Sequence, residues 1–179
     1  RSETLYYKLT DYVRKGKPRS KSRERVFIVH RLDREASGIL VFARHEQAKS
    51  CLQGQWQEVE KRYLAIVHGR MRKLQGEITQ PIFLGKKEPA LTRYRAIKAQ
   101  KSYSVLKVYP ITGRTNQIRI HLSNIGHPLL GERVYAFGKD YTLKFRRVAL
   151  HAQKIEFVHP ISHKKIIVDC SVPRDIEAF

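Results

Sequence analysis

A short polar block separates two apolar runs near the start of the chain. The runs cover residues 26–29 and 39–43, and residues 30–38 between them read His-Arg-Leu-Asp-Arg-Glu-Ala-Ser-Gly. Both runs are short, rich in β-branched and aromatic side chains and free of Pro, which is typical of buried strands. We therefore expect the polar block to be a loop that core strands hold at both ends. A carboxylate on such a loop is held rigidly.

Asp33 is the candidate reactive group of this loop. Arg31 and Arg34 flank it, and because a nearby cation favours the charged form of an acid, Asp33 is expected to be ionised at neutral pH. An ionised carboxylate in a fixed position can act as a nucleophile or as a base. The alternative is that Asp33 caps a turn and both arginines are solvated, which is the usual role of a lone acid between basic residues.

The order of residues in this loop resembles the catalytic loop of the RluA-type pseudouridine synthases. Further blocks match that family in the same order, namely residues 61–69 (Lys-Arg-Tyr-Leu-Ala-Ile-Val-His-Gly), 112–121 (Thr-Gly-Arg-Thr-Asn-Gln-Ile-Arg-Ile-His), 150–152 (Leu-His-Ala) and 157–160 (Phe-x-His-Pro). Separate blocks in family order argue against a chance match, whereas a single block would need structural context. The chain departs from the usual motifs at Ala36, where the family has Thr, and at Asn116, where it commonly has His.

The resemblance assigns roles to individual residues. It implies that Asp33 is the catalytic carboxylate, that Tyr63 stacks on the target base and contacts Asp33, and that Arg119 pairs with Asp33. A bidentate Arg–Asp pair would orient the acid and hold it ionised. Without the resemblance, a strand Tyr is more often a packing residue, and Arg119 could be a surface arginine. The residues implied to bind RNA or the base are Arg31, Arg34, Arg114, Gln117 and Leu150.

The implied activity is isomerisation of specific uridines to pseudouridine in structured ribosomal or transfer RNA, the chemistry of EC class 5.4.99. By resemblance, the enzyme breaks the bond from N1 of uracil to the ribose, turns the base and rejoins it through C5, without a cofactor. The nucleotide has to leave the stack, because its glycosidic bond cannot be reworked inside a helix. Arg31 would enter the space that the base leaves, and Leu150 would form an apolar wall of the uracil pocket. Whether Asp33 acts covalently or as a base stays open.

The charge of the chain agrees with an RNA partner. Lys and Arg number 36 against 16 acidic residues, a formal net charge of +20, and such an excess attracts polyanions. We see no apolar stretch of membrane-spanning length and no basic amphipathic helix, so no membrane partner is expected. No protein partner is evident, and we expect a monomer. Cys51 and Cys170 lie far apart, which fits a reducing compartment, the cytoplasm or an organelle.

Other functions fit the polar residues less well. His30, Asp33 and His121 lack the spacing of metal ligands, so no metal is expected. Ser37 does not stand in a Gly-x-Ser-x-Gly elbow, which argues against a serine hydrolase. The alternative of a different class is a non-catalytic or diverged RNA-binding module with the same fold. A carboxylate at Asp33 argues against it, because binding alone does not call for an acid on a phosphate-seeking surface.

The length of 179 residues suits one domain with a sizeable core. We expect residues 1–25 to be a basic N-terminal arm or partial element and residues 26–179 to be the catalytic domain. Residues 14–25 carry seven basic residues to one acid, with Gly, Pro and Ser between them. Family members usually begin with a strand that ends in a Lys-Pro-x-Gly turn. Lys17-Pro18 lies in the wrong surroundings for that turn, which leaves open that an N-terminal strand is lacking. The chain shows no targeting segment and starts without Met, which hints at a fragment.

The periodicity of apolar residues predicts an α+β fold, a bent, mainly antiparallel mixed sheet flanked by helices. Residues 5–13 suit a short helix or strand, and residues 45–62 suit an amphipathic helix with Trp56 in the core. A second helix should have Thr115 as its N-cap and close at Gly126 and Pro128. The expected strands cover residues 63–68, 76–82, 91–99, 103–109, 148–158 and 164–172, with a hairpin turn at residues 100–102.

Overall fold

A computed structural model describes residues 4–15, 24–83, 85–136, 141 and 143–179. Residues 16–23, which belong to the predicted basic arm over residues 1–25, lie outside the described residues. The chain divides into two compact units. One unit comprises residues 1–31, 40–56 and 158–164, and the other comprises residues 32–39, 57–157 and 165–179.

The first unit contains the apolar run 26–29 and residues 40–43 of the second apolar run. It consists of α1 (Leu5–Val13), β1 (Phe27–Ile28), β3 (Phe42–Ala43) and α2 (Glu46–Gly54). The predicted strands exist but are only two residues long, and they pair with each other in antiparallel fashion. Helix α2 packs against both of them. The start and the end of the polar block are therefore brought together.

His30 and Trp56 reinforce this junction. Nε2 of His30 accepts a hydrogen bond from the backbone N–H of Val41 at 3.0 Å, and Nδ1 faces the carbonyl of Arg31 at 3.3 Å. The imidazole stacks on Trp56 with ring centroids 4.4 Å apart. The predicted helix over residues 45–62 is too long, because α2 ends at Gly54, a poor helix former, and turns follow it. Trp56 thus packs from a turn and not from a helical stripe.

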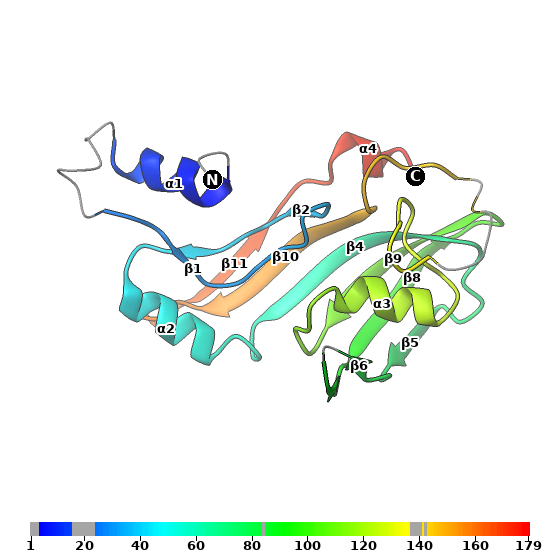
Figure 1. The fold of residues 1–179 in the computed structure, drawn as a ribbon, viewed down its shortest axis with the longest axis horizontal. Coiled ribbons are helices and arrows are strands. Elements are labelled where there is room, and N and C mark those ends of the chain that lie inside the picture. Colours follow the sequence, from blue (N-terminus) through cyan, green and yellow to red (C-terminus); the bar gives the residue numbers. More distant parts are fainter. Residues whose placement is uncertain (1–3, 16–23, 84, 137–140, 142) are drawn as a thin grey trace. The chain divides into compact units, whose positions relative to one another are not determined.

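The second unit is built on a mixed sheet with the strand order β11-β10-β4-β9-β8-β5 (Figure 1). Strands β10, β4, β9, β8 and β5 pair in antiparallel fashion with their neighbours in this order, and β2 (Ser37–Gly38) pairs in parallel with β10. The other strands are β4 (Glu60–His68), β5 (Gln75–Ile78), β8 (Thr92–Ala99), β9 (Tyr103–Pro110), β10 (Leu150–Val158) and β11 (Lys165–Asp169). A small hairpin of β6 (Ile82–Phe83) and β7 (Lys87–Glu88) stands apart from this sheet. The predicted fold class and the β8–β9 hairpin are confirmed.

Alternation along β4 gives the sheet two buried faces. Tyr63, Ala65 and Val67 point to a core that includes residues of helix α3 (Gln117–Asn124). Leu64 and Ile66 point to a second core, which includes a residue of helix α4 (Arg174–Glu177). Helix α3 packs over β8 and β9. None of the described helices is long and apolar enough to cross a bilayer.

Helix α3 begins one residue later than predicted. Its N-cap is Asn116 and not Thr115, and Asn116 has a φ of 54°, in the left-handed region. Asn is among the residues that tolerate this conformation best. The predicted end is confirmed, because the helix stops at Asn124 and Gly126 has a positive φ of 81°.

Candidate active site

The loop that carries Asp33 makes a tight turn and then joins the sheet. The N–H of Ala36 donates to the carbonyl of Asp33 at 3.0 Å, which closes the turn. Strand β2 follows at once, with Ser37 opposite His151 and Gly38 opposite Ala152 of β10. A Cβ at Gly38 would lie 2.2 Å from the carbonyl oxygen of Ala152, and its φ is +113°, so only Gly fits here. The Ser-Gly of the motif thus fixes the loop against β10.

A buried histidine completes this anchor. The hydroxyl of Ser37 lies 3.0 Å from Nδ1 of His151, and Nε2 of His151 faces the carbonyl of Cys170 at 3.5 Å. Burial lowers the pKa of His151, so the neutral ring is the form present at neutral pH. With its proton on Nε2 directed at Cys170, Nδ1 accepts the Ser37 hydroxyl proton.

The charge of Asp33 affects the pKa of Tyr63. Burial raises the pKa of the Tyr63 phenol to about 12, and the negative charge of Asp33 adds to that rise. The phenol therefore stays protonated at neutral pH. Tyr63 lies at the edge of the core that also contains Leu150, where Leu150 is opposite Ala65 in the sheet. Tyr63 and Leu150, the predicted apolar wall, thus belong to one core.

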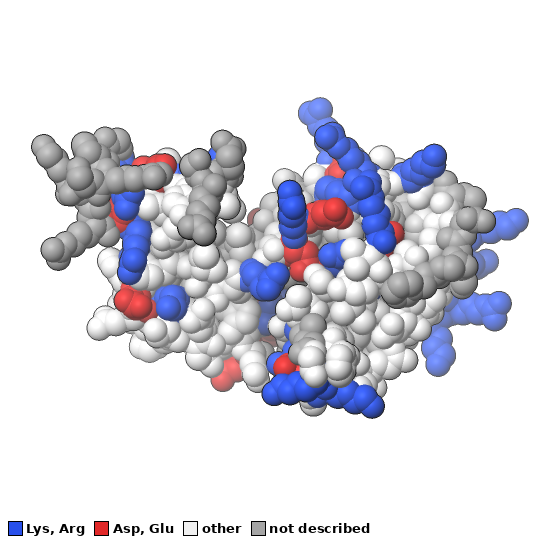
Figure 2. Space-filling view, in the orientation of Figure 1, with Lys and Arg blue, Asp and Glu red and all other residues white. Residues whose placement is uncertain are grey.

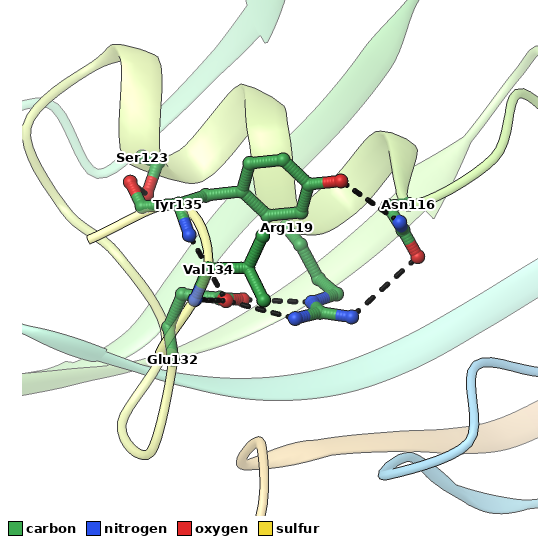
Figure 3. A network of polar contacts seen from close by, with 6 residues as sticks. All are labelled: Asn116, Arg119, Ser123, Glu132, Val134 and Tyr135. Carbon is green, nitrogen blue, oxygen red and sulfur yellow. Dashed lines mark hydrogen bonds and ion pairs between the residues drawn. The ribbon is translucent and has the colours of Figure 1, made fainter. Parts of the chain in front are cut away.

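Arg119 is held by a carboxylate other than the one expected. Nε and Nη2 of Arg119 donate to Oε2 and Oε1 of Glu132 at 2.7 and 2.8 Å (Figure 3). The Nε and Nη2 edge of Arg119 is thus occupied by Glu132, and the pairing of Arg119 with Asp33 that the resemblance implies stays a prediction. The pKa of Arg119 is raised first by the hydrogen bond to Glu132, against the effect of burial, and the charge of Asp33 contributes as well. Asp33 thus acts on Arg119 as well as on Tyr63.

Glu132 is a site residue that the sequence did not reveal. Its carboxylate is fully buried and also accepts the backbone N–H groups of Val134 at 2.9 Å and Tyr135 at 3.2 Å. Burial alone would raise its pKa, but the hydrogen bonds from Arg119 and from these amides outweigh it and lower the pKa. Glu132 is therefore ionised at neutral pH.

Tyr135 forms hydrogen bonds that attach the loop of Glu132 to both ends of helix α3. At the helix start, Nδ2 of Asn116 donates to the Tyr135 hydroxyl at 2.9 Å, and further along Oγ of Ser123 donates to the Tyr135 carbonyl at 2.7 Å. The ring of Tyr135 also lies 5.3 Å from the guanidinium carbon of Arg119 (Figure 3). Nη1 of Arg119 donates to Oδ1 of Asn116 across a long 3.5 Å.

Gln117 was predicted to bind RNA or the base. Its side chain forms hydrogen bonds within the protein. Its side chain donates to the carbonyl of Leu91 at 2.9 Å and to Oγ1 of Thr92 at 3.0 Å. Its Oε1 accepts from the hydroxyl of Thr112 at 2.7 Å and from the N–H of Arg114 at 2.9 Å. With only 3% of the residue exposed, Gln117 shapes the loop before α3.

The predicted RNA-binding arginines differ in their surroundings. Arg114 forms an ion pair with Glu88 at 2.8 Å and donates through Nε to the carbonyl of Pro89 at 3.1 Å. Arg34 is exposed in the turn after Asp33. Arg31 is exposed too but belongs to the first unit, so its approach to the target base stays a prediction.

A pocket of about 460 Å³ lies away from these groups. Arg62, Arg93, Tyr109 and Lys154 line it, and their strand positions place them on the sheet face opposite Tyr63. The pocket is therefore not where Asp33, Tyr63 and Arg119 would meet a base. Among the described residues, no group of His, Cys, Asp and Glu side chains is arranged to hold a metal ion.

The sequence matches a family model along most of its length. Residues 6–124 fit the model described as RNA pseudouridylate synthase. The chain belongs to this family. The resemblance of its motifs to those of the RluA-type pseudouridine synthases is confirmed.

Its relatives include proteins that are named as pseudouridine synthases. The ribosomal large subunit pseudouridine synthase D of Zymomonas mobilis is 37% identical over 171 residues, which cover 84% of this chain and 54% of that protein. The dual-specificity RNA pseudouridine synthase RluA of Vibrio cholerae is 34% identical over 162 residues, which cover 81% of this chain and 65% of that protein. The chain thus spans between half and two thirds of the length of these relatives. The solved human RNA pseudouridylate synthase domain containing 4 shares the fold, with a TM-score of 0.80, 20% identity and coverage of 97% of this chain and 79% of that chain.

Proposed function

We propose that this protein isomerises specific uridines to pseudouridine in structured ribosomal or transfer RNA, with Asp33 as the catalytic carboxylate. The observation that carries the proposal is that the charge of Asp33 acts on both Tyr63 and Arg119. In a pseudouridylate synthase family member, this is the set of groups that such a reaction needs.

Each of the three groups has a distinct part in the proposed reaction. Tyr63, whose phenol hydroxyl stays protonated, offers an aromatic ring against which a flipped uracil can stack. Arg119 supplies a fixed positive charge in the first turn of α3. Asp33 acts on the sugar either by attack at C1′ or by removal of a proton from the ribose. The bond from N1 to C1′ breaks and a bond from C5 to C1′ forms, and in this second step the Asp33–C1′ bond breaks or the ribose regains its proton. C5 then loses its hydrogen to solvent and N1 gains one.

The surface charge supports RNA as the partner. The formal net charge is +20, and Figure 2 shows Lys and Arg side chains projecting at many points of the visible face, with fewer acidic ones. Such an excess attracts the phosphate backbone of RNA and raises the rate of encounter. We also infer a monomer that works without cofactor, metal, membrane or obligate protein partner, in the cytoplasm or an organelle.

The test is to incubate the protein with total cellular RNA that lacks prior modification and to map new pseudouridines. We expect new sites in ribosomal or transfer RNA, within structured regions. If the protein binds these RNAs but yields no new site, a diverged RNA-binding module becomes the better explanation.

A further inference from the structure

The turn that carries Asp33 is attached to the sheet through a very short strand. The N–H of Ala36 donates to the carbonyl of Asp33 at 3.0 Å, and the turn leads directly into β2, which contains only Ser37 and Gly38. The pairing of β2 with β10 is parallel, and parallel pairing is slightly less stable per residue than antiparallel pairing. Ser37 is thus the first residue after Asp33 that pairs with the sheet, and its position determines where the turn is attached.

The side chain of Ser37 adds a directional contact to this pairing. Its hydroxyl lies 3.0 Å from Nδ1 of His151, the residue opposite it on β10. His151 is only 2% exposed, and a hydrogen bond in such surroundings is stronger than one in water. Nε2 of the same ring faces the carbonyl of Cys170 at 3.5 Å, and the N–H of Cys170 donates to the carbonyl of Gln153 at 2.8 Å. The imidazole is therefore oriented by the segment after β11, which is itself attached to β10.

We propose that His151 is a positioning residue of the active site, which fixes the turn of Asp33 through its hydrogen bond to Ser37. The inference rests on the proposed function. A catalytic group has to be held close to its productive geometry, and a misplacement of about 1 Å can cost roughly 100-fold in rate. Because His151 is buried, it acts on the reaction through Ser37 and not through contact with RNA.

The two ring nitrogens of His151 can be tested separately. Asn carries its side-chain oxygen at the position that Nδ1 occupies in His, so His151→Asn keeps an acceptor for the Ser37 hydroxyl. Gln carries its amide nitrogen at about the reach of Nε2, so His151→Gln keeps a donor toward Cys170 but loses the acceptor. Ser37→Ala removes the same contact from the other side and leaves the buried ring in place.

The measurements separate rate, affinity and folding. Single-turnover release of tritium from RNA labelled at C5 of uridine, at saturating protein, gives the rate, filter binding gives RNA affinity, and a thermal melt gives the folded fraction. We expect Ser37→Ala and His151→Gln to slow the rate per folded molecule about 10-fold, less than a full 1 Å misplacement can cost. RNA affinity should stay within about twofold, because neither change removes a cation that contacts phosphate. His151→Asn should keep a rate close to that of the parent.

Two controls separate positioning from general effects. Ser162→Ala removes an exposed contact of the same kind, between its Oγ and Nδ1 of His159 at 3.2 Å, and should keep the parent rate. In the double variant of Ser37→Ala with His151→Gln, the loss of rate should be no larger than in either single variant, because both changes break one contact.

Two results would overturn the inference. The first is a parent-like rate per folded molecule in Ser37→Ala, which would show that the contact does not position Asp33. The second is equal slowing in His151→Asn and His151→Gln, which would place the effect at Cys170 or in the ring itself and not at Nδ1. If His151→Gln does not fold, Ser37→Ala still tests the same contact. An inactive parent chain would instead count against the proposed function, so the two failures are distinct.

Discussion

The hydroxyl of Ser37 lies 3.0 Å from Nδ1 of His151, and this contact ties the loop that carries Asp33 to strand β10. Ser37 and His151 are also opposite each other in the parallel β2–β10 pair. Because Asp33 stands only one turn before Ser37, the contact limits how far the carboxylate can move. The family motifs containing Asp33 and His151 thus meet in one piece of structure.

The burial of His151 makes the stability of the protein sensitive to acid. Burial lowers the pKa of His151 in the folded state, whereas an unfolded His has a pKa of about 6.5. The unfolded chain therefore binds more protons below about pH 6.5, and stability is lost as the pH falls through that value. We expect His151→Asn to lower the free energy of unfolding at pH 7 by about 1 kcal/mol, because a buried hydrogen bond is weakened.

The variant should also lose less stability than the parent between pH 7 and pH 5. Urea unfolding at both pH values measures this difference, and His45→Asn, which removes an exposed histidine, is the control. An unchanged pH dependence in His151→Asn would show that other groups, such as the buried His121, govern the acid response.

Substitutions of Asn116 test whether it matters that this chain has Asn where the family commonly has His. Its left-handed φ of 54° suits Asn and His but not β-branched residues, and its amide holds the Tyr135 hydroxyl at 2.9 Å. Asn116→His keeps a donor at similar reach, so turnover and melting temperature should stay close to those of the parent. Asn116→Val should lose about 1–2 kcal/mol of stability from the backbone strain alone. A large gain in rate for Asn116→His would mark this chain as a weakened member of its family.

Strand alternation made much of the fold readable from the sequence. Tyr63, Ala65 and Val67 face one core and Leu64 and Ile66 the other, as their period of two requires. The length of α2 was overestimated because the helical spacing of Trp56 continues past Gly54, where the helix ends. Local periodicity cannot tell a turn residue that stacks on His30 from a helical core residue.

The site was only partly readable, for a different reason. Motif order singled out Asp33, Tyr63 and Arg119, and the charge of Asp33 is among the causes that raise the pKa of both Tyr63 and Arg119. The partner of Arg119 was missed because Glu132 reaches it only when the loop after α3 folds back, and no periodic pattern records such a return. Gln117 was assigned to RNA by its place in the family motif alone, and a motif does not record the tertiary contacts that bury it.

A substitution of Arg31 tests its predicted role in flipping the target base out of the RNA. If its guanidinium fills the gap left by the flipped uridine, its contacts offset an unstacking cost of a few kcal/mol, roughly the general cost of flipping. Arg31→Ala should therefore slow modification most on structured RNA and much less on a short unstructured oligonucleotide. Single-turnover rates on both substrates give the ratio, with the exposed Arg44→Ala as the control for loss of one positive charge. Equal slowing on both RNAs would point to a role in holding the Asp33 loop.

Asp33→Asn separates reactivity from shape. Asn is nearly isosteric with Asp and keeps the turn that the backbone of Asp33 closes with Ala36, but it cannot act as a nucleophile or base. We expect the variant to fold, to bind RNA as well as the parent or slightly better through lost repulsion of phosphate, and to release no tritium from RNA labelled at C5. Release is the right measurement because attachment at C5 has to expel that hydrogen.

The exposed Glu35→Gln in the same turn is the matched control, since it removes an acid two residues away and should keep the parent rate. A structural Asp33 would give a different pattern, in which Asp33→Asn loses about 1–3 kcal/mol of stability while its folded fraction still turns over. Filter binding and a thermal melt run beside the tritium assay separate these cases. Tritium release by Asp33→Asn at anything near the parent rate would remove the catalytic role from this carboxylate, because Asn at this position can act neither as a nucleophile nor as a base.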